Sequence, residues 1–319
     1  MIPGCVNRLA PALLLVFLCS CICFGPRVAA AESWAETRTE MPKFENRLQT
    51  RHFVFKWTDR SSDPADNIRD PAIIKKTAGY FEYAWNKYVS LFGRTPYVPP
   101  GKSRIRVVFL HLDVYAYADP PDAPIQLNSY VWSKMPSIRQ STSAHELFHK
   151  LQYAFGYKTR WAPRKNMRWF IEGTAAWAEV YVWGRVTRSC KIEDMFKNTG
   201  LGLYDSQDMA LPFWIYFVSG NCGRPKNDLM VKLFKNYERS GDAKSALIDT
   251  VRESYGPEDT FFHRFALERR KDFWHGAALK ECNHYTRILG PDGEDLVSKM
   301  EKYQHDEHEA TPGRPGKGL

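Results

Sequence analysis

The chain has 319 residues and a formal net charge of +9, with 44% hydrophobic and 25% charged residues. These proportions are ordinary for a globular protein and argue against a chain that is disordered throughout. The length is enough for a sizeable core in one large or two modest domains. The basic residues are dispersed and not interleaved with aromatic residues, so no nucleic-acid partner is expected and a solvated basic surface is the simplest interpretation.

The N-terminus has the layout of a secretory signal peptide. Arg8 precedes an apolar run at residues 12–24, and Val28-Ala29-Ala30-Ala31 offers an A-x-A cleavage site. The run is too short to span a bilayer comfortably. We therefore expect residues 1–31 to be removed, the protein to be secreted or periplasmic, and no integral membrane segment to remain. A lipoprotein signal at Leu18-Cys19-Ser20-Cys21 is the alternative.

Three of the seven cysteines, Cys190, Cys222 and Cys282, lie beyond that leader. In an oxidising compartment two of them could pair, and the sequence does not tell which two. Because their spacing lacks close C-x-x-C pairs, a zinc site made of thiolates is not expected.

Residues 32–135 are expected to form an N-terminal α/β subdomain. Residues 52–57 and 104–110 are rich in β-formers and predict strands. Between them, Asp70-Pro71 predicts the start of a helix whose apolar residues recur with a period of 3.6. A third strand is predicted at residues 125–132, directly before the next helix, where an extended peptide could pair with it.

The loop at residues 116–124, before that third strand, is rich in proline and aspartate. Its carboxylates would suit a calcium ion, but nothing in the pattern defines a ligand geometry.

His145, Glu146 and His149 spell H-E-x-x-H. On a helix, residues four apart lie on one face, about one turn from each other. Two imidazoles so placed can bind one divalent metal ion, and the carboxylate beside the first can reach a water molecule on that metal. Gln152 continues the same polar line. The motif also occurs by accident in helices, so its interpretation depends on the rest of the chain.

Two starts are possible for the helix that carries this motif. Ser137-x-x-Gln140 has capping-box spacing, and so does Ser143-x-x-Glu146. If Ser143 is the N-cap, Glu146 is merely a capping carboxylate. The apolar stripe within residues 144–155 predicts a helix in either case, and Gly156 is expected to end it.

A second helix is predicted by W-F-I-E-G-T-A-A-W-A-E at residues 169–179. Glu172, Ala175, Ala176 and Glu179 share one face of it, and the small residues allow another helix to come close. A carboxylate buried in such a contact needs a partner, and a metal ion is a strong one. Alternatively, both glutamates face solvent or form salt bridges, but the upstream motif favours the metal.

Together, H-E-L-F-H and this E-G-T-A-A segment resemble the gluzincin superfamily of zinc metallopeptidases. The similarity covers about residues 141–183 and is closest to secreted branches in which Gln follows H-E-x-x-H. It implies that His145, His149 and Glu172 bind one Zn²⁺ per chain and that Glu146 is the general base. It also implies an α+β, zincin-like fold: a small mixed sheet with a flanking helix, then a mostly helical half, with the metal in the cleft between.

The same resemblance suggests two supporting roles. Gluzincins often add a Tyr or His that stabilises the developing oxyanion. Tyr204, shortly before an apolar helix predicted at residues 211–218, is the first candidate for that role, with Tyr216 and His263 as alternatives. Glu179 could accept a hydrogen bond from a ligand imidazole and so fix its orientation.

Residues 136–298 are expected to form a helical catalytic subdomain, with further helices at residues 228–237, 244–255 and 259–274. Residues 299–319 are polar and are expected to be a disordered tail. The sequence therefore predicts a secreted zinc metallopeptidase that acts on a peptide or protein substrate. The alternative is a non-catalytic secreted binding protein that retains the zincin scaffold.

Overall fold

The computed structural model describes residues 41–157, 167–184, 211–219, 226–262 and 264. The described residues from Pro42 onward belong to one compact unit. The expected signal peptide, the expected C-terminal tail and the three downstream cysteines all lie outside the described residues. Among the described helices, none combines the length and apolar character needed to cross a bilayer.

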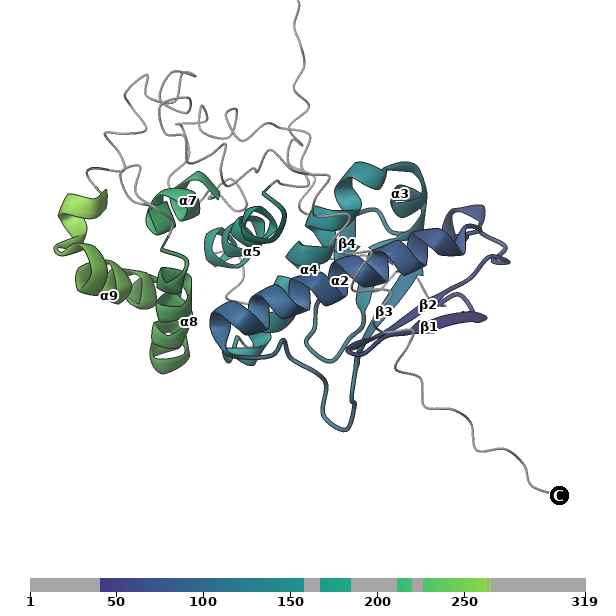
Figure 1. Cartoon of the computed structure of the whole chain (residues 1–319), viewed down its shortest axis with the longest axis horizontal. Coiled ribbons are helices and arrows are strands. Elements are labelled where there is room, and N and C mark those ends of the chain that lie inside the picture. Colours follow the sequence, from purple (N-terminus) through teal and green to yellow (C-terminus); the bar gives the residue numbers. More distant parts are fainter. Residues whose placement is uncertain (1–40, 158–166, 185–210, 220–225, 263, 265–319) are drawn as a thin grey trace, which may run out of the picture. The chain divides into compact units, whose positions relative to one another are not determined.

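A five-stranded mixed sheet forms the N-terminal part of this unit, in the order β1-β2-β3-β5-β4 (Figure 1). The central strands β2, β3 and β5 are parallel, and β1 and β4 pair antiparallel at the two edges. The strands are β1 (Asn46–Gln49), β2 (Phe53–Trp57), β3 (Ile105–Leu110), β4 (Ala116–Tyr117) and β5 (Ile125–Asn128).

The prediction for residues 125–132 is wrong in its second half, because β5 ends at Asn128 and helix α3 (Ser129–Lys134) begins there. Asn128 has extended backbone angles, and its side chain accepts a hydrogen bond from the Val131 N–H. An asparagine in this conformation is a good helix N-cap, so it turns the chain from strand to helix. Since β5 pairs with β3 and β4, the edge of the sheet on this side is β4.

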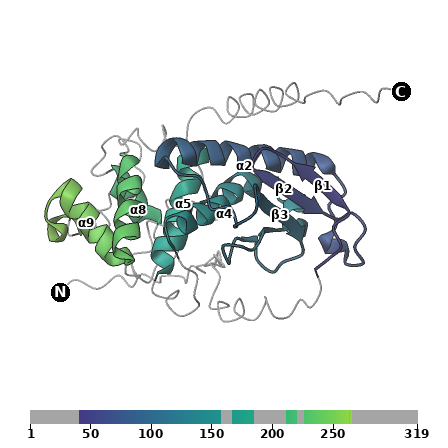
Figure 2. The ribbon, with the colours of Figure 1, turned by 90° about the horizontal axis from the view of Figure 1, so that it is seen from below.

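Helix α2 (Pro71–Phe92) covers one face of the sheet (Figures 1 and 2). It begins as predicted: the Asp70 carboxylate accepts a hydrogen bond from the Ala72 N–H at 2.9 Å, and Pro71 occupies the first turn. Its apolar stripe packs on the strands, with the ring of Phe81 5.3 Å from that of Phe53. Burial of that stripe holds the helix on the sheet.

The rest of the described chain is helical, which makes the fold α+β. Helix α4 packs against both α2 and α5, and the chain continues from α5 through α7 to the paired α8 and α9. Figure 2 shows α4 and α5 side by side. The helices are α4 (Arg139–Ala154), α5 (Arg168–Trp183), α7 (Leu211–Ser219), α8 (Asp228–Ser240) and α9 (Ala243–Tyr255), with short 3-10 turns at Pro64–Asp66 and Pro136–Ile138.

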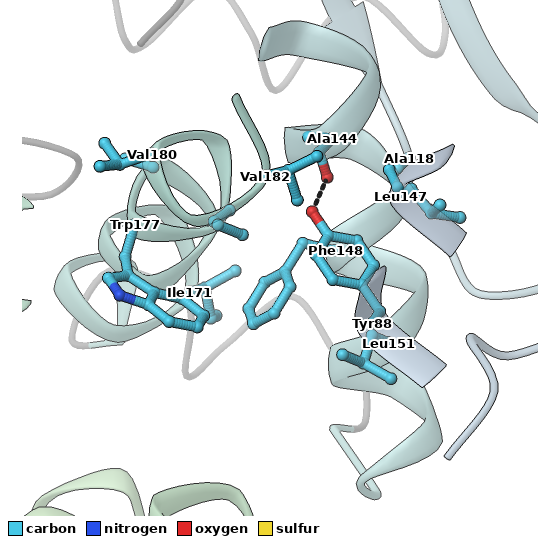
Figure 3. Packing of buried hydrophobic residues seen from close by; sticks show 14 of the residues in the cluster. Tyr88, Ala118, Ala144, Leu147, Phe148, Leu151, Ile171, Trp177, Val180 and Val182 are labelled. Carbon is cyan, nitrogen blue, oxygen red and sulfur yellow. Dashed lines mark hydrogen bonds between the residues drawn. The ribbon is translucent and has the colours of Figure 1, made fainter. Parts of the chain in front are cut away.

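Helix α4, which carries H-E-x-x-H, is anchored on several sides. Phe148 is fully buried, and its ring lies 5.3 Å from Tyr88 of α2, 6.0 Å from Trp177 of α5 and 5.6 Å from Phe234 of α8. The Tyr88 hydroxyl also donates a hydrogen bond to the Ala144 carbonyl at 2.8 Å (Figure 3). These contacts fix the helix that presents the two histidines.

The start of α4 resolves the two capping alternatives. The helix begins at Arg139, and no side chain forms a cap hydrogen bond there. Ser143 lies inside the helix, where its hydroxyl donates to the Arg139 carbonyl at 2.6 Å. The Ser143 N-cap is therefore wrong, and Glu146 does not act as its capping carboxylate. The Ser137 start is within two residues of the observed one, although its capping box does not form.

Candidate metal centre

The two histidines of H-E-x-x-H lie one turn apart on α4. Their ring centroids are 4.8 Å apart and their planes meet at 80°. The side chains of His145 and His149 are 12% and 13% exposed. Both imidazoles therefore sit at the edge of the core, where solvent still reaches them.

Glu172 of α5 approaches both imidazoles. Its Oε2 is 3.3 Å from His145 Nε2 and 3.7 Å from His149 Nε2. The approach depends on small residues, since Ala175 and Ala176 of the same helix are buried and α4 packs closely against α5. The side chain of Glu172 is 31% exposed, so this side of the cluster opens toward solvent.

Glu179 lies behind the first histidine. Its Oε1 is 2.7 Å from His145 Nδ1, and its side chain is 3% exposed. The carboxylate oxygen accepts here, so this contact places a proton on Nδ1. When the ring carries that proton alone, the lone pair of Nε2 faces Glu172. The hydrogen bond that the sequence suggested for Glu179 is thus present in the structure.

Gln152 lies behind the second histidine. Its Oε1 is 2.8 Å from His149 Nδ1, while its Nε2 donates to the Ile171 carbonyl at 2.8 Å and to Thr174 Oγ1 at 2.9 Å. The carbonyl partner fixes the amide orientation, so Gln152 accepts from Nδ1–H and leaves the lone pair of His149 Nε2 facing Glu172. The sequence placed Gln152 on the polar line of the helix but did not predict this bridge between α4 and α5.

Two imidazole Nε2 atoms thus lie near one carboxylate oxygen, and all three atoms are acceptors when each ring carries its proton on Nδ1 alone. Zinc–nitrogen and zinc–oxygen bonds of about 2.0–2.1 Å at tetrahedral angles separate neighbouring ligand atoms by roughly 3.3–3.4 Å. The observed separations from Glu172 Oε2 are 3.3 and 3.7 Å. One proton could bridge Glu172 to one of the imidazoles, whereas a cation between the three atoms would satisfy all of them.

The charges around the two imidazoles also favour a cation. Burial opposes protonation of His145, but hydrogen bonds with Glu172 and Glu179 outweigh it and raise its pKa to about 10. Burial would raise the pKa of Glu172, but the hydrogen bond with His145 prevails and lowers it to about 2. Burial lowers the pKa of His149. The carboxylates thus favour a positive charge at His145, either a second proton on Nε2 or a cation bound there in its place, while His149 stays neutral.

Glu146 completes the cluster. It is 6% exposed, and burial raises its pKa to about 8, with Glu172 and Glu179 adding to the effect. His145, Glu146 and His149 each offer a ligand atom within 4.8 Å of the others, so this group is close enough to hold a metal ion. Glu172 is the carboxylate that lies near both Nε2 atoms, which makes it the better candidate for a third ligand.

Two of the three candidates for an oxyanion-stabilising residue, Tyr204 and His263, lie outside the described residues. Tyr216 belongs to α7, where it is 5% exposed and its ring lies 5.3 Å from that of Phe261 in the hydrophobic core. The role of Tyr204 therefore stays a prediction.

The chain was compared with protein-family models, curated proteins and solved structures, and none of them matches it. The class that fold and site define is an α+β protein with a histidine–glutamate cluster able to hold a metal ion. A more specific assignment depends on the geometry of the cluster.

Proposed function

We propose that the protein is a zinc-dependent metallopeptidase of the gluzincin type, with a zincin-like fold and one zinc ion per chain. The observation that carries this proposal is the convergence of His145 Nε2, His149 Nε2 and Glu172 Oε2 at separations of 3.3 and 3.7 Å from the carboxylate oxygen. Two imidazoles and a carboxylate are a ligand set that suits zinc.

The protein's own groups would hold and orient such an ion. His145, His149 and Glu172 would supply three ligands, the number that the protein provides in catalytic zinc sites. Zinc in this setting supplies Lewis acidity and makes water a nucleophile at neutral pH. Glu179 and Gln152 fix the two rings by holding the Nδ1 protons, so that both Nε2 lone pairs face the same point.

Glu146 would move the proton. Its carboxylate is buried, and its pKa of about 8 places it close to the range in which a side chain both accepts and releases a proton at neutral pH. A cation bound beside it would lower that pKa toward the range of a base. Glu146 would take a proton from the attacking water and pass it to the leaving amine.

The substrate would be a peptide or protein in an extended conformation. Strand β4 forms the edge of the sheet and lies against α4, so an extended segment pairing with it would run close to the histidines. This replaces the sequence-based expectation that a strand at residues 125–132 offers the pairing edge.

Metal analysis and a cleavage assay on purified protein test the proposal together. We expect about one zinc per chain and cleavage of casein. Glu146→Gln should keep the zinc and lose the cleavage, because the base is absent while the ligands remain. Glu172→Ala should lose both.

Other outcomes would change the conclusion. One zinc per chain without cleavage by the wild type would favour the alternative of a non-catalytic binding protein. Wild-type protein that takes up no zinc would defeat both hypotheses.

A further inference from the structure

Lys150, the residue after His149, is a lysine with no exposed surface. Its side chain leaves α4 on the side of the loop that joins β4 to β5. There its Nζ donates to three backbone carbonyls: Pro120 at 3.3 Å, Pro121 at 2.8 Å and Ala123 at 2.9 Å. A fully buried lysine is rare unless its charge is matched, so this arrangement needs a physical reason.

The geometry fits the charged form. A neutral amine has two N–H donors, whereas the ammonium has three, and three carbonyl oxygens surround the nitrogen. Without this donor the Pro121 and Ala123 carbonyls would lose their Lys150 hydrogen bonds, whereas the Pro120 carbonyl also accepts from the Ala123 N–H at 3.0 Å.

Further contacts join the same loop to α4. The Tyr153 hydroxyl donates to Asp119 Oδ1 at 2.6 Å, and the Lys150 carbonyl accepts from the Tyr97 N–H at 2.8 Å. The Tyr97 hydroxyl in turn donates to Asp122 at 2.9 Å. The aspartates, which the sequence suggested as calcium ligands, therefore bind tyrosine hydroxyls, and the converging carbonyls bind an ammonium.

We propose that the Lys150 ammonium acts as a built-in cation that fixes the β4–β5 loop, and with it edge strand β4, to the helix that carries the two histidines. Lys150 is then a positioning residue: it sets where the sheet edge lies relative to the metal centre without touching the reacting atoms. The consequence for substrate binding rests on the proposed function, whereas the consequence for loop order does not.

Hydrogen exchange measures loop order directly. In Lys150→Met, which keeps most of the side-chain volume, we expect amides within residues 116–124 to exchange at least about tenfold faster than in the wild type, because local opening becomes easier. Zinc content should stay near that of the wild type. Lys76→Met, at an exposed lysine of α2, is the matched control and should leave exchange in this loop unchanged.

Chemical rescue separates the cation from mere packing. Lys150→Ala removes the atoms of n-propylamine, so millimolar n-propylammonium should restore slow exchange in the loop. Tetramethylammonium, which lacks N–H donors, should not. If the loop of Lys150→Ala exchanges as slowly as that of the wild type, or if both ions rescue equally, the proposal is overturned.

The kinetic readout links the loop to the proposed reaction. For casein cleavage by Lys150→Met we expect KM to rise about tenfold while kcat changes by less than about threefold, because the loop positions substrate and not the proton-transfer group. A fall in kcat with unchanged KM would contradict the positioning role. If the wild type cleaves nothing, the proposed peptidase fails, but the exchange and rescue experiments still decide the role of Lys150.

Should the Lys150 variants fail to fold, the wild type itself provides the test. Native-state exchange should then show the loop amides opening together with those of α4, as one cooperative unit. Loop amides that open more than about a hundredfold more often than α4 amides would overturn the proposal.

Discussion

The two histidines of the candidate metal centre are held in different ways. His145 is backed by a carboxylate from the neighbouring helix, Glu179, whereas His149 is backed by an amide from its own helix, Gln152. The difference follows from what stands behind each partner. Gln152 must donate to the Ile171 carbonyl as well as accept from the imidazole, and only an amide does both. One imidazole is therefore oriented by a charged side chain, and the other by an amide that also links α4 to α5.

The largest loss of zinc affinity should come from changing Glu172, because its carboxylate lies near both histidines. Removing its carboxylate in Glu172→Ala should weaken zinc binding by at least about a thousandfold, roughly 4 kcal/mol, because both Nε2 atoms lose their common neighbour. Isothermal titration or competition with a chelator measures the affinity. The chelator should lower the Tm of the wild type but not that of the variant.

Glu253→Ala is a suitable control for Glu172→Ala, because this glutamate lies on α9 in an ion pair with Lys232. It should leave zinc affinity unchanged. Equal affinities of Glu172→Ala and the wild type would show that Glu172 is not a ligand.

Glu179→Gln tests how the negative charge behind His145 affects zinc affinity. The amide can still accept from Nδ1, so the ring stays in place while the negative charge disappears. We expect zinc affinity to fall by about 10- to 100-fold, the usual range for partners of ligating histidines. A variant that binds zinc as tightly as the wild type would mean that the two histidines are equivalent.

The reciprocal change, Gln152→Glu, should lower the stability of the fold. A carboxylate at this position, 1% exposed, cannot donate to the Ile171 carbonyl or to Thr174 Oγ1. We expect a loss of about 2 kcal/mol in the free energy of unfolding, measured by urea denaturation with chelator present. Glu179→Gln under the same conditions should cost less. The reverse order would contradict the bridging role of Gln152.

The smallest effect is expected for Tyr88→Phe, which removes the hydroxyl that binds the Ala144 carbonyl just before His145. The ring stays packed against Phe148, so only one buried hydrogen bond is lost, at a cost of about 1 kcal/mol in unfolding free energy. Zinc affinity should stay within about threefold of the wild type, because neither histidine loses its own partner. A larger loss of affinity would show that the α2 contact also orients the ring.

Local sequence signals predicted the start of α2 and the inner face of α5. Asp70-Pro71 marks the start of α2, and the spacing of Glu172 and Glu179 indicates the face that α5 turns toward α4. Strands β1 and β4 were not predicted, because they are short edge strands without a marked hydrophobic pattern. Asn128 was read as part of a strand, since its capping role depends on the helix that follows.

The candidate site was accessible to sequence reasoning only in part. His145, His149 and Glu172 can be predicted from residue type and spacing, because residues one turn apart on a helix share a face. The bridge made by Gln152 depends on the Ile171 carbonyl of another helix, and the three carbonyls at Lys150 depend on the path of a loop. Such backbone partners have no signature in side-chain patterns.

The division of the cluster between two helices has a consequence for how the chain matures. During synthesis, His145 and His149 leave the ribosome before Glu172, with residues 150–171 between them. Helix α4 by itself lacks Glu172, the carboxylate that lies near both Nε2 atoms, so on the proposed function a nascent chain would hold zinc only weakly until α5 has docked. Stable zinc binding would therefore depend on correct packing of α4 against α5, and chains whose helices are misaligned would remain without metal.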